Sequence, residues 1–221
     1  MSAKAWLVLL GAALMGCGVV GLSAAAPAAT ASYATIDEAI AKGGVEDVKK
    51  FIESNPKILQ GEGGTKLAPL HQAILRRKTA IALFLIERGA DINAPDNAAR
   101  TPLHLAVERN DRAVLVALLD GKAELVRRDR IGWTPLHHAA AKNQVELARI
   151  ILDRGAPPNA LSELGGTPLH EAAAGGGVEM VKLLLERGTD PKVRSKPGVT
   201  ALDLAKEYKN ADVVALLETV R

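Results

Sequence analysis

The sequence predicts an all-α solenoid of six helix–turn–helix repeats of about 33 residues each, joined by hairpin loops. The first observation is the tetrapeptide TPLH, which begins at Thr101, Thr134 and Thr167 and so recurs at a constant spacing. The second is the composition, in which 48% of residues are hydrophobic but only 3% are aromatic. A core of small aliphatic side chains favours closely packed helices over strands, which draw on aromatic and β-branched residues.

The same register continues on both sides of the three TPLH copies. One step of this spacing back leads to APLH at Ala68, a second leads to Thr35, and one step forward leads to TALD at Thr200. Units starting near residues 35, 68, 101, 134, 167 and 200 therefore tile a domain of residues 32–221 without insertion. A single unit of this size cannot bury its apolar face alone, so we expect the units to stack.

Each unit predicts where its first helix begins and ends. The threonine can cap the helix start with its side-chain oxygen, and the proline that follows suits the first helical position. The turn after this helix needs a residue that tolerates left-handed backbone. The residues at this turn are Asn110, Asn143 and Gly176.

The second helix of a unit is expected to end at a glycine, which suits the C-terminal cap. These glycines are Gly89, Gly155 and Gly188. The third unit has Lys122 at this position. We expect a local distortion there, at a cost on the order of 1 kcal/mol if Lys122 takes a positive φ.

The motif T-P-L-H-x-A, repeated at this constant spacing, resembles the ankyrin repeat. The resemblance covers nearly all of residues 32–221. It implies a solenoid that binds proteins through an extended concave face. The first unit lacks Pro-Leu-His, and the last lacks the proline and the histidine, so both are expected to be capping repeats.

Four histidines occupy the same position in successive units. The resemblance implies that they join a structural hydrogen-bond network with the threonine hydroxyl and the loops of adjacent units. The residues of this motif are His71, Thr101, His104, Thr134, His137, Thr167 and His170. Stacking would place the imidazoles roughly 10 Å apart, too far for shared zinc ligation. His138 falls one residue later, and we expect it to be a partly exposed surface residue.

No residue pattern in the sequence predicts catalysis. The serines lack the nucleophile-elbow pattern, and the one cysteine, Cys17, lies in the N-terminal apolar run. The glycine-rich stretches at residues 61–64 and 172–177 lack the spacing of phosphate-binding loops. We therefore expect a protein that is not an enzyme and that needs no cofactor and no metal.

In ankyrin repeats the variable contact positions lie at fixed offsets from the threonine. Carried over to the third and fourth units, these positions give the candidate partner-binding residues Arg100, Glu108, Arg109, Arg130, Ile131, Trp133 and Lys142, with Asn97, Ala98 and Ala141. The neighbouring units give Leu75, Arg76, Glu163, Leu164, Gly166, Ala174, Gly175, Glu207 and Tyr208.

The candidate residues of the third and fourth units are uneven in charge. Four cations face one acid, Glu108, around Trp133 and Ile131. An aromatic anchor ringed by arginines is typical of protein–protein hot spots, so we expect a protein partner with an acidic surface. Two other interpretations stay open: Trp133 packs only on its own hairpin, and the basic residues form a solvated face.

Several functions are compatible with this surface. We expect a monomeric scaffold that holds a protein partner, and the alternative is an immunity-type inhibitor of a toxin or enzyme. A further alternative is binding of nucleic acid or an anionic surface through the basic stretches 76–78 and 127–130. Expected export argues against nucleic acid, as do the net charge of only +3 and the absence of interleaved aromatics for stacking.

The N-terminal segment, residues 1–31, is expected to direct export. No charged residue occurs between Lys4 and Asp37, and residues 5–26 are apolar apart from Ser23. This pattern is typical of a signal peptide, cleaved near Ala31 to leave a periplasmic or secreted protein. Two alternatives are lipid attachment at Cys17, because LMGC resembles a lipobox, and a retained membrane anchor. In each case we expect membrane contact only through this segment.

Overall fold

The computed structural model describes residues 33–60 and 67–220, which belong to one compact unit, Tyr33–Arg221. The predictions for residues 1–31, including lipid attachment at Cys17, lie outside the described residues. Within the two described ranges, no helix is both long and apolar enough to cross a membrane.

The described chain folds into pairs of short helices in the order that the repeat register predicts, which confirms an all-α solenoid. The first helices of repeats 1 to 6 are α1 (Ile36–Lys42), α3 (Pro69–Leu75), α5 (Pro102–Arg109), α7 (Pro135–Ala141), α9 (Pro168–Gly175) and α11 (Ala201–Glu207). The second helices are α2 (Val45–Ser54), α4 (Thr79–Glu87), α6 (Arg112–Asp120), α8 (Val145–Asp153), α10 (Val178–Glu186) and α12 (Ala211–Thr219). A short 3₁₀ helix, η1 (Pro56–Gln60), follows α2.

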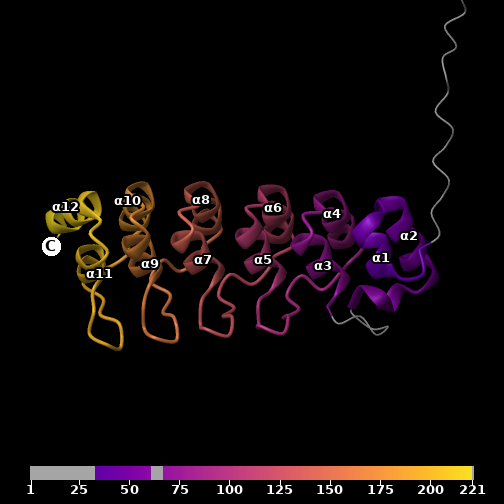
Figure 1. Ribbon diagram of the computed structural model, residues 1–221, viewed down its shortest axis with the longest axis horizontal. Coiled ribbons are helices and arrows are strands. Elements are labelled where there is room, and N and C mark those ends of the chain that lie inside the picture. Colours follow the sequence, from indigo (N-terminus) through magenta and orange to yellow (C-terminus); the bar gives the residue numbers. More distant parts are fainter. Residues whose placement is uncertain (1–32, 61–66, 221) are drawn as a thin grey trace, which may run out of the picture. The chain divides into compact units, whose positions relative to one another are not determined.

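The helices form two layers, and each repeat packs against its neighbours (Figure 1). The first helices contact one another in series from α1 to α11, and the second helices do so from α2 to α12. The hairpin loops before α5, α7, α9 and α11 project from the side of the first helices, below them in Figure 1. Stacking of this kind turns the apolar faces of single repeats into one continuous core.

Small side chains at one repeated position let the first helices approach closely. Ala73, Ala106, Ala139, Ala172 and Ala205 occupy the same position in successive first helices, and each is 0% exposed. A larger side chain here would overpack the contact between adjacent helices. The alanine-rich composition is thus a requirement of the stacking.

The predicted boundaries of the first helices are confirmed. Proline is the first residue of α5, α7 and α9, where its missing N–H costs no hydrogen bond. The turns after these helices have left-handed backbone, with φ of 55° at Asn110, 52° at Asn143 and 72° at Gly176. Arg77 and Lys209 take the same conformation in repeats 2 and 6, with φ of 57° and 59°.

Lys122 adopts a positive φ of 65° where the next repeat has Gly155 at 91°. The predicted local distortion is nevertheless wrong. The Lys122 N–H donates to the Leu119 carbonyl at 3.0 Å, as the Gly155 N–H does to the Leu152 carbonyl at 2.9 Å. The strain therefore stays within one residue, because the surrounding hydrogen bonds keep the turn in its usual form.

Replacing Lys122 by glycine is expected to stabilise the domain by about 1 kcal/mol, because glycine adopts a positive φ without the Cβ penalty. The measurement is the urea midpoint followed by circular dichroism. Lys122→Ala is the matched control, since it removes the same side chain but keeps the Cβ. An equal gain in both variants would show that the lysine side chain, and not its backbone conformation, is unfavourable.

Candidate protein-binding site

Threonine–histidine pairs at the starts of α5, α7 and α9 link each repeat to the next. In α5, Nδ1 of His104 lies 2.9 Å from the Thr101 hydroxyl oxygen and accepts the Thr101 N–H at 3.1 Å. Nε2 of His104 lies 3.1 Å from the carbonyl oxygen of Trp133 in the following repeat. The same arrangement recurs in α7 and α9.

These hydrogen-bond partners determine the protonation of the imidazoles. A carbonyl oxygen can only accept, so Nε2 carries the hydrogen and Nδ1 is the acceptor for threonine. The rings are therefore neutral. Burial lowers the pKa of His104 to about 4, against a smaller opposing effect of the hydrogen bond to Trp133. Burial likewise lowers the pKa of His137 to about 4 and lowers the pKa of His170.

His71 departs from this arrangement on the threonine side, so it shares the predicted network only in part. Ala68 occupies the threonine position and offers no hydroxyl group. Neither buried ring nitrogen of His71 makes a well-formed hydrogen bond, and burial lowers its pKa against the opposing effects of Asp96 and of the nearby carbonyls of Arg100 and Ala94. Because an unpaired buried polar group costs about 1–3 kcal/mol, this position stabilises the stack less than its counterparts do.

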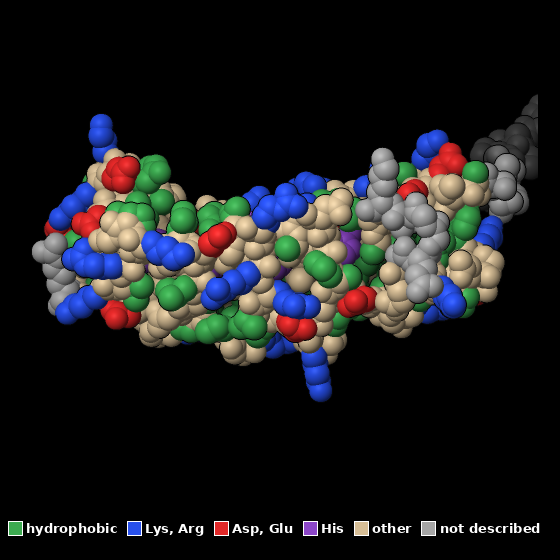
Figure 2. Space-filling view, turned by 90° about the horizontal axis from the view of Figure 1, so that it is seen from below, with side chains coloured by type: hydrophobic (Ala, Val, Ile, Leu, Met, Phe, Trp, Pro, Cys, Tyr) green, Lys and Arg blue, Asp and Glu red, His purple; other side chains and the backbone are tan. Residues whose placement is uncertain are grey.

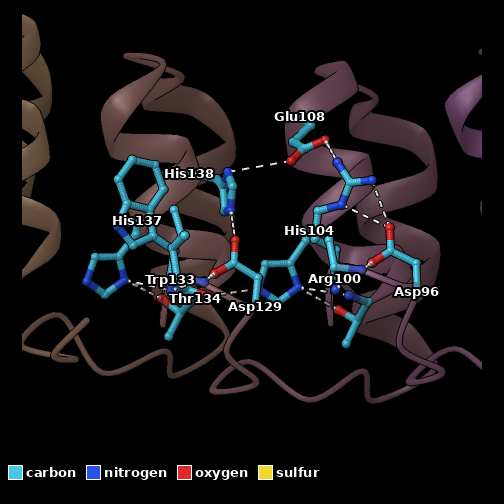
Figure 3. A network of polar contacts seen from close by, with 12 residues as sticks. Asp96, Arg100, His104, Glu108, Asp129, Trp133, Thr134, His137 and His138 are labelled. Carbon is cyan, nitrogen blue, oxygen red and sulfur yellow. Dashed lines mark hydrogen bonds and ion pairs between the residues drawn. The ribbon is translucent and has the colours of Figure 1, made fainter. Parts of the chain in front are cut away.

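The expectation that His138 is a partly exposed surface residue is also wrong. The residue is only 8% exposed, and its ring lies between two acids (Figure 3). Nε2 donates to Oδ2 of Asp129 at 2.8 Å, and Nδ1 lies 3.8 Å from Oε1 of Glu108. His138 thus ties α7 to the hairpin that precedes it and to α5 of repeat 3. In the part of the chain that the structure describes, no three acidic, histidine or cysteine side chains are grouped to hold a metal ion.

The expected contrast of four cations with one acid is wrong as well, because Asp96 and Asp129 also reach this region. Arg100 donates to Asp96 at 2.8 Å and to Glu108 at 2.9 Å (Figure 3). Burial acts to raise the pKa of Asp96, but hydrogen bonds from Arg100 and from backbone N–H groups lower it overall. Asp96, Arg100, Glu108, His138 and Asp129 form what we call the ion-pair chain, so Arg100 offers little free charge to a partner.

Asp129 holds the tip of its hairpin through the backbone. Its Oδ1 accepts the N–H groups of Ile131 and Trp133 at 3.1 and 2.9 Å. Asp96 makes the same pair of bonds one repeat earlier. Sequence reasoning missed both aspartates, although their separation by one full repeat was a signal that could have identified them.

Trp133 is half-buried against two histidines. Its ring stacks on His137 at 6.3 Å between centroids and meets the edge of His138 at 5.1 Å. Its backbone N–H donates to Asp129, and its carbonyl accepts from His104. The side chain therefore braces its hairpin, and only part of the ring is open to a partner.

Arg130, Ile131 and Lys142 are the exposed residues among the predicted contact positions of repeat 4. Ile131 is 53% exposed at the tip of the hairpin. Arg130 donates to the carbonyl of Asn97 in the preceding hairpin, and Lys142 donates to the carbonyl of Glu108 at 3.4 Å. Both side chains remain exposed to solvent although each donates a hydrogen bond to repeat 3.

Arg109, another predicted contact residue, is the last residue of α5. It lines a notch there with Arg77 and Arg112. Its Nε is buried and has no hydrogen-bond partner. The described contacts thus place Arg109 apart from the group around Trp133.

Three more exposed apolar side chains lie near Ile131 in the fold: Val126 on the same hairpin, and Leu161 and Leu164 on the next hairpin. Val126, Leu161 and Leu164 are 56%, 44% and 66% exposed. Leu164 has the same position as Ile131 one repeat later and is one of the contact positions that the resemblance implies. Val126 and Leu161 lie outside those positions, and no pattern in the sequence marked them, because their exposure depends on the path of the loop.

A family model that describes three consecutive ankyrin repeats matches the chain over four overlapping ranges, residues 36–129, 97–162, 118–195 and 155–219. The chain therefore belongs to the ankyrin-repeat family. Ankyrin repeats are generic protein–protein interaction modules, and members of the family are typically scaffolds without catalytic activity. No curated protein matches the sequence.

Proposed function

We propose that the chain is an exported scaffold that holds an acidic protein partner against the hairpins and first helices of repeats 4 and 5. The apolar run at residues 5–26 supports export. The exposed hydrophobic and basic side chains of the hairpins support a partner that is an acidic protein. This function narrows the general role of ankyrin repeats to one surface.

One surface feature carries the proposal: exposed large hydrophobic side chains gather on two neighbouring hairpins. Val126 and Ile131 precede α7, and Leu161 and Leu164 precede α9, with exposures from 44% to 66%. Figure 2, which views the hairpin side, has hydrophobic side chains among lysines and arginines. Exposed apolar groups rimmed by polar residues are typical of interaction sites in soluble proteins.

Exposed cations border this apolar group. They lie on the hairpins before α7 and α11 and are Arg127, Arg128, Arg130, Lys192, Arg194 and Lys196. Arg127 is paired with Glu124 at 3.1 Å. The exposed acids Glu124, Glu163 and Asp190 lie on the hairpins before α7, α9 and α11, so the rim keeps a net positive charge. A rim of net positive charge steers an acidic partner and raises its association rate, whereas the apolar centre supplies most of the affinity. An acidic partner with apolar side chains fits this arrangement.

The ion-pair chain beneath the surface supports the contact residues. Asp129 binds the backbone N–H of Ile131, and His138 binds Asp129 from α7. A contact residue held in place before binding loses less conformational freedom when the partner arrives. Arg100, Glu108 and the inner part of Trp133 thus act as supports rather than as contacts.

The experiment begins with capture of the partner by the full chain and its identification, followed by affinity measurements on variants. Ile131→Asp and Leu164→Asp are each expected to weaken binding about 30-fold or more, since a hot-spot side chain contributes about 2 kcal/mol. Arg130→Glu is expected to slow association and to reduce its dependence on salt.

The control is Arg149→Glu, an exposed position on α8 in the other helix layer. The free energy of unfolding is measured for every variant, so that a loss of fold is not mistaken for a loss of contact. If Arg149→Glu weakens binding as much as Leu164→Asp, the contact surface lies elsewhere. Trp133→Ala is expected to lower binding and stability together, because its ring packs on two histidines.

A further inference from the structure

A second basic surface lies at the turns between the two helices of repeats 2 and 3. A notch of about 250 Å³ is lined there by Arg77, Thr79, Arg109, Asn110, Asp111 and Arg112. Arg77 comes from repeat 2 and the other two arginines from repeat 3, so the stacking of repeats brings the three together. The notch lies at the C-terminal ends of α3 and α5, whereas the hairpin of repeat 3 leads into the N-terminal end of α5.

The arginines of the notch have donors that the protein does not use. Nε of Arg109 is buried and has no hydrogen-bond partner. Arg77 donates through Nη1 to the Arg109 carbonyl at 3.0 Å, and Arg112 donates through Nε to Glu146 at 2.6 Å. A guanidinium group has five N–H donors, so these described contacts leave donors on each arginine. Apart from Nη1 of Arg77, the terminal nitrogens of the three arginines have no acceptor among these described contacts, and an oxyanion in the notch would supply one.

The acids near the notch are already engaged. Oδ1 of Asp111 accepts the N–H of Val114 at 3.1 Å, and Oδ2 accepts the Thr79 hydroxyl at 2.5 Å. Glu146 accepts from Arg112. Three guanidinium groups against these two carboxylates leave an excess of positive charge.

We infer that this notch binds one oxyanion group, a phosphate or a carboxylate. The planar guanidinium group matches the paired oxygens of both. The volume of about 250 Å³ lies below the range of roughly 300–1,000 Å³ for pockets that hold whole small molecules, so the notch suits a single charged group. Arg76 and Lys78 adjoin it in sequence and add positive charge, so binding weakens as ionic strength rises.

The test is a titration of the full chain with sodium phosphate and, separately, with sodium acetate at constant ionic strength. Backbone amide NMR signals of residues 109–113 are expected to shift and to saturate. Arg109→Gln is expected to weaken binding about tenfold, the change for loss of one hydrogen bond to a charged group. The matched control is Arg149→Gln on α8, which is expected to leave the affinity within about twofold because its charge is distant and screened.

The two anions distinguish the source of the bound group. Saturation with phosphate alone assigns a phosphate group, and saturation with acetate as well assigns any oxyanion, acidic side chains included. Arg109→Lys is also expected to weaken binding, because an ammonium group cannot replace the paired, planar N–H donors of a guanidinium group. The inference is overturned if neither anion gives saturable shifts, if Arg149→Gln weakens binding as much as Arg109→Gln, or if Arg109→Lys binds like the native chain.

Discussion

Gly132→Ala is expected to destabilise the domain by about 3 kcal/mol, whereas Gly198→Ala costs about 1 kcal/mol. The two glycines occupy the same hairpin position two repeats apart, with φ of 79° and 84°, so alanine is strained at both. A Cβ on Gly132 would clash with the backbone nitrogen of Glu163, whereas a Cβ on Gly198 would meet no atom within 4 Å. The difference between the variants therefore measures the close approach of neighbouring hairpins.

Urea unfolding followed by circular dichroism gives both free energies. Gly165→Ala is an intermediate case, because its Cβ would lie 3.2 Å from the backbone nitrogen of Lys196. Its loss of stability is expected to fall between those of the other two variants. Equal losses at Gly132 and Gly198 would mean that the hairpins move apart at little cost, and the close approach would then have no role in stability.

Lowering the pH from 7 to 5 is expected to reduce the free energy of unfolding by on the order of 2 kcal/mol for each of His104 and His137. Burial keeps the native pKa of both near 4, while the unfolded chain titrates near 6.5. Between these values the unfolded state binds more protons, so stability falls as the pH drops through this window. His71 and His170 act in the same direction. Half-buried Glu171, whose pKa is raised by desolvation, acts in the opposite direction, because its contribution to stability falls as the pH rises above 4.5.

The measurement is the free energy of unfolding in urea at pH 7, 6 and 5. The control is the double variant His104→Gln and His137→Gln, whose side chains do not titrate. It is expected to be less stable than the native chain at pH 7 but to lose less stability on acidification. A native chain with the same free energy of unfolding at pH 7 and pH 5 would contradict the assignment of neutral, buried imidazoles.

The helices could be located from the sequence because their boundary residues act through their own backbone. Proline starts α5, α7 and α9, and asparagine or glycine turns the chain after them, whatever surrounds these residues. Lys122 illustrates the limit of this reasoning. Its positive φ was predictable from the glycines at the same position, but the unchanged hydrogen bonds around it depend on how the whole turn is held.

The contacts of the candidate site could be predicted only in part. The offsets from the threonine identified Ile131 and Leu164, which are exposed. They did not predict the burial of His138, because the two acids that surround it come from another helix and from a hairpin. They also did not predict that Asp96 binds Arg100, since a contact position says nothing about which charges are neutralised within the fold.

The threonine–histidine pairs give the array a direction. Each imidazole bonds the threonine of its own helix and the carbonyl of the repeat that follows, so a repeat is completed by the neighbour on its C-terminal side. In repeat 6, Asp203 replaces the histidine, and its Oδ2 accepts the N–H and the hydroxyl of Thr200 at 2.9 and 2.7 Å. Both hydrogen bonds therefore stay within the first turn of α11. A carboxylate in place of an imidazole thus makes a repeat self-contained on the side where the others depend on a successor.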